Sequence, residues 1–222
     1  MSSADDLHHD PDYFRRMYAA DADPWGFDRR WYERRKYAVT LASLPNERYR
    51  HAYEPGCANG SLTELLAPRC DRIDATELVP EVAARATERL AGFTHVSVRC
   101  APFPTWWPDT PIDLLVLSEV AYYLRPPGRS LVADHIRRSL ATGGEVLAVH
   151  YTDPTDYPMQ GRDVAVWLDG INILERVVRH VDAQFELTVW RRRLNRPDGV
   201  RSPAVTPAAN SAVACIIRRA AG

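Results

Sequence analysis

The sequence predicts an α/β fold built on a doubly wound, mainly parallel sheet. Short apolar runs alternate with helical segments from residue 51 to residue 150, the rhythm of repeated strand–helix–strand units. One run, Ile112–Ser118, is apolar nearly throughout, as a central strand buried on both faces requires. Between the first predicted strand and its helix, Tyr53–Leu66 reads Y-E-P-G-C-A-N-G-S-L-T-E-L-L and places two glycines in the connection.

The N-terminal part of the chain precedes this sheet. Residues 1–11 are polar and acidic and are predicted to form a disordered tail. Helices are predicted over 12–20 and 28–44, with the turn D-P-W-G between them. Aromatic residues crowd this segment, which favours a helical lid over 12–45; the alternative is an amphipathic helix packed on the sheet edge. With a sheet core over 50–222, residues 12–222 form one predicted domain.

The sheet is predicted element by element. Strands are predicted over 51–54, 72–76, 96–99, 112–118 and 145–150, and helices over 61–67, 80–91 and 128–140. Two further runs, 185–192 and 212–218, alternate with period 2 and flank a stretch rich in proline, asparagine, glycine and serine. Joined by a hairpin-like connection, these two runs would complete the sheet with an antiparallel pair.

Acidic residues and glycines mark the predicted ligand end of the sheet. Glu54 and Glu77 close the first two strands, where a parallel α/β sheet binds nucleoside ligands. Gly56 and Gly60 would let the backbone approach such a ligand where a Cβ would collide. The two acids predict a nucleoside cofactor with Glu77 on its ribose hydroxyls. The alternative is an ordinary strand–turn–helix connection with two turn glycines.

The spacing of the glycines indicates which nucleoside. Gly56 and Gly60 do not fit G-x-G-x-x-G, so a dinucleotide pyrophosphate has no cradle, and no G-x-x-x-x-G-K-[ST] occurs. A carboxylate at Glu54 would repel a phosphate but suits a cation such as the ammonium of S-adenosylmethionine. A nicotinamide-dependent oxidoreductase is disfavoured for the same reasons.

Composition argues against several classes of function. With a net charge of −1, the chain has no excess positive charge to attract nucleic acid. The 28 basic residues include a single lysine, Lys36. No apolar run approaches the roughly 18 residues of a membrane span, and residues 1–12 lack the apolar core of a signal peptide. The 4 cysteines are widely separated and the histidines show no metal-ligand spacing, so no metal site is predicted. We expect a cytoplasmic protein.

Six motifs in order carry a resemblance to a known family. They are D-P-W-G (23–26), W-Y-E-R-R-K-Y (31–37), E-P-G-C-A-N-G (54–60), the strand ending at Glu77, L-S-E-V-A-Y-Y-L (117–124) and L-A-V-H (147–150). The chain resembles the class I S-adenosylmethionine-dependent methyltransferases, in particular the nodulation protein S N-methyltransferases, over residues 12–192. This implies a Rossmann-like seven-stranded sheet with its last strand antiparallel, S-adenosyl-L-methionine as methyl donor and S-adenosyl-L-homocysteine as product.

The resemblance also implies which residues meet the cofactor. They are Trp25, Tyr32, Glu54, Gly56, Cys57, Ala58, Gly60, Glu77, Leu78, Ala101, Pro102, Phe103, Ser118 and Glu119. Two positions depart from the family pattern. Ala58 stands at the middle glycine of E-x-G-x-G-x-G, and Pro102 stands where such enzymes usually carry an aspartate for the adenine amino group. Arg34, Arg35 and Lys36 indicate a solvated face, although one of them could meet the cofactor carboxylate. Lys36 or Tyr37 is also expected near the cofactor.

The resemblance points to a few candidate catalytic residues. Glu119 is the first candidate to direct the proton of an acceptor amine, the alternative being a surface or capping glutamate. His150 is a candidate general base, or else a structural histidine. Tyr122, Tyr123, His150 and Tyr151 are the predicted substrate contacts, although simple packing would also explain such tyrosines.

The expected reaction is methyl transfer to a small-molecule acceptor. N-methylation of an amino sugar, oligosaccharide or similar amine is the leading expectation, because the resembling family methylates a free amine on a chitooligosaccharide. O- or C-methylation of a secondary metabolite is the alternative within the class. A non-catalytic module that binds S-adenosylmethionine is the alternative outside it. We expect a monomer or homodimer with neither nucleic acid nor membrane as partner.

Overall fold

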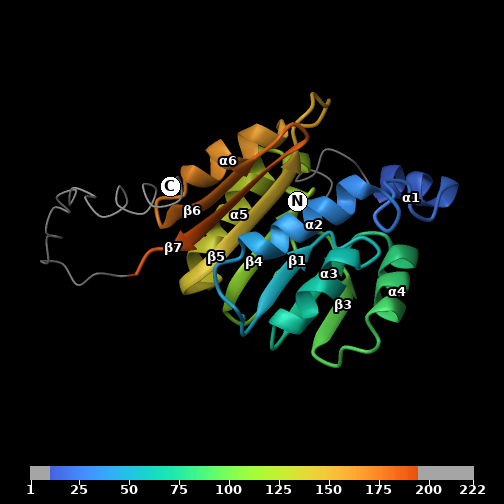
Figure 1. Ribbon diagram of the computed structural model, residues 1–222, viewed down its shortest axis with the longest axis horizontal. Helices are drawn as coiled ribbons and strands as arrows, with labels where there is room; N and C mark the ends of the chain where they lie inside the picture. Colours follow the sequence, from blue (N-terminus) through green and yellow to red (C-terminus); the bar gives the residue numbers. More distant parts are fainter. Residues whose placement is uncertain (1–10, 195–222) are drawn as a thin grey trace, which may run out of the picture.

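The computed structural model describes residues 11–194 and centres on one seven-stranded sheet (Figure 1). Its strands are β1 (Ala52–Pro55), β2 (Ile73–Glu77), β3 (Val96–Cys100), β4 (Ile112–Ser118), β5 (Leu140–Tyr151), β6 (Leu174–Val181) and β7 (Phe185–Arg192). They lie in the order β3-β2-β1-β4-β5-β7-β6, and β7 is antiparallel to both of its neighbours. This confirms the predicted doubly wound sheet with its last strand antiparallel.

Helices cover both faces of the sheet. They are α1 (Pro11–Ala20), α2 (Trp31–Ser43), α3 (Ser61–Leu66), α4 (Pro80–Arg89), α5 (Pro126–Ser139) and α6 (Gly161–Asp169), with short 3-10 turns η2 (Ala67–Arg69) and η3 (Ala121–Tyr123). Helices α2, α3 and α4 pack on one face, whereas α5 and α6 pack on the other (Figure 1). Within residues 11–194, no helix has the length and apolar character that crossing a bilayer requires.

Strand β4 shows how the sequence pattern produces the core. Its residues Leu114, Leu115, Val116 and Leu117 are all fully buried. Leu115 and Leu117 join the cluster under α5 and α6, whereas Leu114 and Val116 join the cluster under α2 and α3. Successive side chains of a strand point to opposite faces, so a strand between two helical layers needs apolar residues at every position.

The far edge of the sheet differs from the prediction. Strand β7 has the predicted bounds, but its partners are β5 and β6, with Tyr151 opposite Phe185 and Val181 opposite Glu186. The predicted pairing of 185–192 with 212–218 is therefore wrong, because β7 is paired on both sides; residues 212–218 lie outside the described part of the chain. The sequence pattern does not predict β6, because this edge strand, L-E-R-V-V-R-H-V, is mostly exposed and lacks apolar alternation. Helix α6 is likewise not predicted.

The order of the strands creates one point at which the winding reverses. From β1 the sheet continues to β2 and β3 in one direction, and β4 and β5 lie on the other side of β1. Strands β1, β2, β4 and β5 are parallel, so their carboxyl ends meet at one edge. Helix α1 lies next to this edge (Figure 1). Ligands of open α/β sheets bind at such a switch point.

Candidate active site

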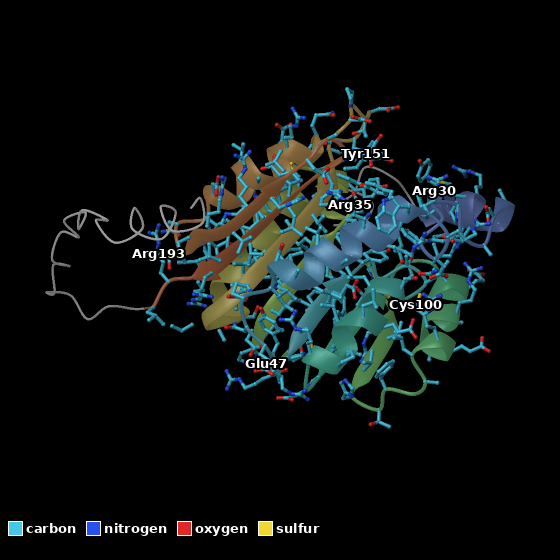
Figure 2. The ribbon with its side chains drawn as sticks, viewed as in Figure 1. Arg30, Arg35, Glu47, Cys100, Tyr151 and Arg193 are labelled. Atoms are coloured by element: carbon cyan, nitrogen blue, oxygen red, sulfur yellow. The ribbon has the colours of Figure 1, made fainter. Side chains whose placement is uncertain are left out.

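A cavity of about 570 Å³ opens at the switch point. The carboxyl ends of β1, β2, β4 and β5 bound it on one side, and α1, the following turn and α2 bound it on the other. Figure 2 shows Arg30, Tyr151 and Cys100 on this side of the molecule, whereas Glu47 lies at the opposite edge of the sheet. A cavity of this size can bury most of a drug-sized ligand.

Most of the predicted site residues lie in the wall of this cavity. They are Trp25, Tyr32, Glu54, Gly56, Cys57, Ala58, Glu77, Leu78, Ala101, Phe103, Ser118, Glu119, Tyr122, Tyr123 and Tyr151. Gly60, Pro102 and His150 are not in the wall. The structure thus brings together residues that the sequence separates by more than a hundred positions, but their functional roles stay predictions.

Other residues complete the wall, and of these only Lys36 and Tyr37 are expected, as alternatives, near the cofactor. They are Phe14, Tyr18, Phe27, Arg30, Glu33, Lys36, Tyr37, Leu62, Val120, Thr155, Tyr157 and Gln184. The N-terminal members belong to the aromatic-rich segment, and that clustering is the signal by which they could be found. Thr155, Tyr157 and Gln184 come from loops after β5 and β6 that carry no motif.

Backbone donors hold the Glu77 carboxylate at the end of β2. Ala58 N–H donates to Oε2 at 3.1 Å, and Val79 N–H donates to Oε1 at 2.9 Å. Burial raises the pKa of Glu77, and these donors oppose the increase. Each carboxylate oxygen has more than one acceptor site, so the group can still receive hydrogen bonds from a ligand in the cavity.

Gly56 and Gly60, the two glycines of the motif, permit close packing at different places. Both adopt positive φ, +68° at Gly56 and +82° at Gly60. A Cβ on Gly56 would lie 3.1 Å from Val120, a wall residue, so this glycine permits close packing at the cavity. A Cβ on Gly60 would lie 3.1 Å from Leu90 instead. Gly60 therefore allows α3 and α4 to pack closely and is not in the cavity wall, and its contact with the ligand stays a prediction.

Ala58 replaces the middle glycine and adopts a strained conformation, with φ at 49°. We expect Ala58→Gly to raise the free energy of unfolding by about 1 kcal/mol, because the left-handed region costs a residue with a Cβ about that much. Urea denaturation followed by tryptophan fluorescence measures the change. Ala84→Gly, at an exposed position of helix α4, is the matched control and should lower stability by about 1 kcal/mol. Equal destabilisation by both changes would contradict the strain at Ala58.

Glu54 is a buried carboxylate that accepts one side-chain hydrogen bond from within residues 11–194. Its exposed fraction is 3%, and Thr63 Oγ1 donates to Oε2 at 2.6 Å. Burial raises the pKa of Glu54 to about 7, and the Thr63 hydroxyl only partly opposes this. A cation in the cavity would lower that pKa again, because it favours the ionised form.

Lys36, the single lysine of the chain, lies between two carboxylates in the cavity wall. Its side chain is 1% exposed, and Nζ lies 2.9 Å from Glu33 Oε2 and 2.8 Å from Glu119 Oε1. Burial lowers the pKa of Lys36, but Glu119 and Glu33 outweigh burial, so the pKa lies above its usual value. The predicted solvated face is therefore wrong for Lys36, although Arg34 is exposed.

The Glu119 carboxylate accepts several hydrogen bonds, and the Glu119 backbone is strained, with φ at 53°. Besides Lys36, the Tyr32 hydroxyl donates to Oε1 at 3.4 Å, and Tyr151 N–H donates to Oε2 at 3.0 Å. Burial alone would raise the pKa of Glu119, but the Lys36 ammonium above all, with the Tyr151 N–H, outweighs burial and holds it below its usual value. The carboxylate therefore stays ionised and suits hydrogen-bond acceptance better than storage of a proton.

His150 does not reach the cavity. Its exposed fraction is 1%, and Nε2 accepts a hydrogen bond from Ala121 N–H at 3.1 Å. Burial lowers the pKa of His150 to about 4, so the ring is neutral near pH 7. Side chains alternate along β5, and it is Tyr151 that lies in the wall. The geometry supports the structural alternative and not a general base in contact with the acceptor.

The fold and the site together define a class of protein. The strand order, the single antiparallel strand and a cavity of buried carboxylates at the switch point are those of the class I, Rossmann-like methyltransferase fold. The model of the family Nodulation protein S (NodS) matches residues 6–139. The chain belongs to that family.

Relatives and solved structures agree with this assignment. The nodulation protein S of Rhizobium tropici is 34% identical over 142 residues, 63% of this chain and 59% of the relative. A trans-aconitate 2-methyltransferase of Rhizobium rhizogenes is 34% identical over 123 residues, 53% of this chain and 44% of the relative. The N-methyltransferase NodS of Bradyrhizobium japonicum WM9, solved with S-adenosyl-L-homocysteine, is 27% identical with a TM-score of 0.72, covering 82% of this chain and 97% of that one. The chain spans 53–59% of the length of the nodulation protein S relatives it matches.

Proposed function

We propose that the protein binds S-adenosylmethionine and catalyses transfer of its methyl group to an amine of a small-molecule acceptor. The observation that carries the proposal is the set of carboxylates in the cavity wall. Glu33, Glu54, Glu77 and Glu119 are all largely buried there, and Lys36 compensates two of them. Buried carboxylates without a counterion are costly, so the cavity favours a ligand that brings positive charge.

The residues present fit this cofactor. Glu77 is held where it can accept hydrogen bonds from ribose hydroxyls, and Glu54 is a counterion for an amino group. Pro102 offers no carboxylate to adenine and is not in the wall, so backbone groups near Ala101 and apolar contact with Phe103 take that part. When bound, S-adenosylmethionine supplies an electrophilic methyl group on a sulfonium centre.

The acceptor end of the cavity favours an amine over an anion. Glu119 can accept a hydrogen bond from the amine N–H and so orient the nitrogen lone pair toward the methyl group, and positioning of this kind supplies much of the rate. A polyanion such as trans-aconitate would need free cations. In the wall, as far as the structure describes it, the cations are Arg30 and the already paired Lys36.

We also propose that residues 12–45 act as a lid. Phe14, Tyr18 and Trp25 lie in the cavity wall and reach over the carboxyl ends of the strands. The segment is fastened to the sheet side through Asp28, which accepts hydrogen bonds from Arg89 Nη2 at 2.6 Å and from Ser61 Oγ at 2.7 Å. A covered cavity excludes water from the transfer step.

The first test is calorimetric titration with S-adenosylhomocysteine, with NAD as the control. We expect micromolar binding of the first and none of the second. Methyl transfer to a panel of amines, with hydroxyl and carboxylate acceptors alongside, then tests the reaction by mass spectrometry of the product. Binding without transfer to any acceptor would favour the non-catalytic module, and tight binding of NAD would overturn the proposed cofactor.

Affinity for S-adenosylhomocysteine is expected to rise with pH between about 5.5 and 8. The pKa of Glu54 is raised to about 7 in the free protein, and the cationic amino group of the ligand requires the ionised carboxylate. Below that pKa binding must release a proton, so affinity should fall by about tenfold per pH unit. Calorimetry in buffers of different ionisation enthalpy should show the released proton directly.

A pH-dependent gain in the stability of the free protein cannot explain this rise in affinity. Glu54 gives up its proton near its ordinary pKa of 4.5 when unfolded but near 7 when folded, so this group makes the free protein less stable as pH rises between those values. Glu54→Gln should bind more weakly and lose most of the pH dependence. A variant that kept the full slope would assign the released proton to another group.

A further inference from the structure

Glu33 is a buried carboxylate in the cavity wall, and one of its oxygens has no aligned hydrogen-bond donor. The exposed fraction of Glu33 is 4%, and Oε2 forms no hydrogen bond within residues 11–194, although Lys36 Nζ lies 2.9 Å away. Buried polar atoms rarely lack a hydrogen-bond partner, and a catalytic role is one reason for an exception. A lone pair on this oxygen is therefore open to a proton.

Lys36 connects Glu33 to the acceptor end of the cavity. Its Nζ lies 2.9 Å from Glu33 Oε2 and donates a hydrogen bond to Glu119 Oε1 at 2.8 Å. The Glu119 side chain is 18% exposed and that of Glu33 is 6% exposed, so Glu119 is the carboxylate more open to a ligand. The ammonium has three N–H groups on a flexible stem, so a small rotation can direct one of them to Glu33 while another stays on Glu119.

The two carboxylates differ in how readily they hold a proton. Burial raises the pKa of Glu33, and Lys36 opposes the increase without cancelling it. Burial also acts on Glu119, but Lys36 outweighs it and holds the pKa of Glu119 below its usual value. Glu119 raises the pKa of Glu33 further, whereas the Tyr37 hydroxyl lowers it. Tyr32 also faces both carboxylates. Carboxyl groups whose pKa values are shifted in opposite directions divide the tasks of an active site, and Glu33 is the better store for a proton.

We propose that Glu33 receives, through Lys36, the proton that an acceptor amine loses before it is methylated. The inference rests on the proposed function, because it requires an amine bound at Glu119. A carboxylate favours the ammonium form of that amine, whose nitrogen has no lone pair for attack. The proton moves to Glu119, and Lys36 takes it while passing another to Glu33 Oε2. Lys36 ends as an ammonium and Glu119 as a carboxylate, so the net change is a neutral Glu33.

Charges and bonds balance in this relay without a further reactant. The freed lone pair of the nitrogen forms the bond to the methyl carbon, and the electron pair of the broken C–S bond stays on sulfur. The sulfonium charge is lost, Glu33 has become neutral, and the methylated amine leaves as a cation. Once the products have left, the proton returns through Lys36 to Glu119, the more exposed carboxylate, and from there to water.

Two acceptors that differ in protonation test the relay. Benzylamine is an ammonium at pH 7, whereas O-benzylhydroxylamine is neutral and already has its lone pair. Each is offered with S-adenosylmethionine to the full chain, and the product is measured by mass spectrometry. We expect Glu33→Gln to lower kcat for benzylamine about 100-fold, as loss of a general base does, and to leave kcat for O-benzylhydroxylamine within about threefold. Glu33→Asp keeps a carboxylate and should restore part of the loss.

The pH profile distinguishes a proton acceptor from a counterion. With benzylamine, kcat of the native enzyme should rise with pH while Glu33 loses its proton and then level off, because the relay requires the ionised carboxylate. In Glu33→Gln it should keep rising, about tenfold per pH unit, toward the pKa of the amine itself, because solvent must then remove the proton. Infrared spectra of the free protein need no turnover. The protonated-carboxyl band that Glu33→Gln removes should persist above the pH at which an ordinary glutamate ionises.

Glu81→Gln, at an exposed position of helix α4, is the matched control and should behave as the native protein in every assay. Affinity for S-adenosylhomocysteine should be native in Glu33→Gln, because the amide oxygen still faces Lys36. Equal losses on both amines, an unchanged pH profile, or a carboxyl band removed by Glu119→Gln instead would overturn the relay while the proposed function stood. Failure of the native enzyme to methylate either amine would overturn both.

Discussion

Replacing Lys36 with methionine will lower the free energy of unfolding by about 3–5 kcal/mol, the range found when one partner of a buried ion pair is removed. Methionine keeps the length of the side chain but leaves Glu33 and Glu119 facing each other without the ammonium that joins them. Glu33 is buried and the Glu119 side chain is 18% exposed, so water can replace only part of the lost charge. Urea denaturation near pH 7 measures the change, and acidification should recover part of it because protonation removes the repulsion.

Two further variants distinguish the effect of lost charge on stability from the effect of burial. Arg137→Met breaks the exposed ion pair with Asp134, in which the side chains are 44% and 57% exposed, and should change stability by less than about 1 kcal/mol. Adding Glu119→Gln to Lys36→Met removes one of the stranded charges and should restore part of the loss. If Lys36→Met were no more destabilising than Arg137→Met, the three groups would not act as one buried cluster.

The cluster of Glu33, Lys36 and Glu119 also shows why the buried face of helix α2 is only partly predictable from the sequence. Glu33, Lys36, Tyr37 and Thr40 recur at the spacing of one helix face, and all are buried. A helix is normally oriented by its apolar stripe, but part of the inward stripe of α2 is polar because Glu33 and Lys36 line the cavity. From the sequence alone, charged residues at such positions predict a solvated surface, because the position of the partner, here Glu119, is not known.

The bounds of β1 to β4 were predictable to within one residue because buried strands have continuous apolar runs, but β5 begins at Leu140, five residues before its predicted start. Strand β4 has the predicted bounds, and β1 and β2 are shifted by one residue. Strand β6 lies at the sheet edge, where one side is unpaired and much of the surface is wet, so apolar alternation is absent. The segment 212–218 does alternate, and pattern alone therefore assigned the wrong partner to β7.

The location of a candidate residue in the cavity wall is predictable where the residue ends a strand, and it is not predictable where side-chain direction decides. Glu54, Glu77 and Glu119 follow their strands into the cavity wall, as the switch-point rule requires. His150 and Tyr151 are neighbours on β5, yet one lies under η3 and the other lines the cavity. A shift of one residue along a strand exchanges the two faces of the sheet. The sequence does not indicate whether His150 or Tyr151 faces the ligand. Thr155 lies in a loop whose position depends on Gln160, which no local pattern reveals.

Glu77→Ala is expected to weaken binding of S-adenosylhomocysteine about 100-fold. On the proposed function this carboxylate accepts hydrogen bonds from ribose hydroxyls, and hydrogen bonds to a charged group contribute about 1.5–3 kcal/mol each. A loss of about 2.7 kcal/mol corresponds to the factor of 100. Calorimetric titration measures it, and Glu81→Ala, at an exposed position of helix α4, is the control that should bind as the native protein does.

Alanine at this position also removes the acceptor of Ala58 N–H and Val79 N–H, so a loss of affinity alone would not separate ligand contact from a disturbed loop. Glu77→Gln resolves this, because the amide oxygen keeps one acceptor for the backbone while the charge is lost. If Glu77 acts on the ligand, Gln should restore the stability of the free protein more completely than it restores affinity. If stability and affinity recover in parallel, Glu77 shapes the loop and the ribose contact is wrong. A folded Glu77→Ala variant with native affinity would contradict the ribose contact outright.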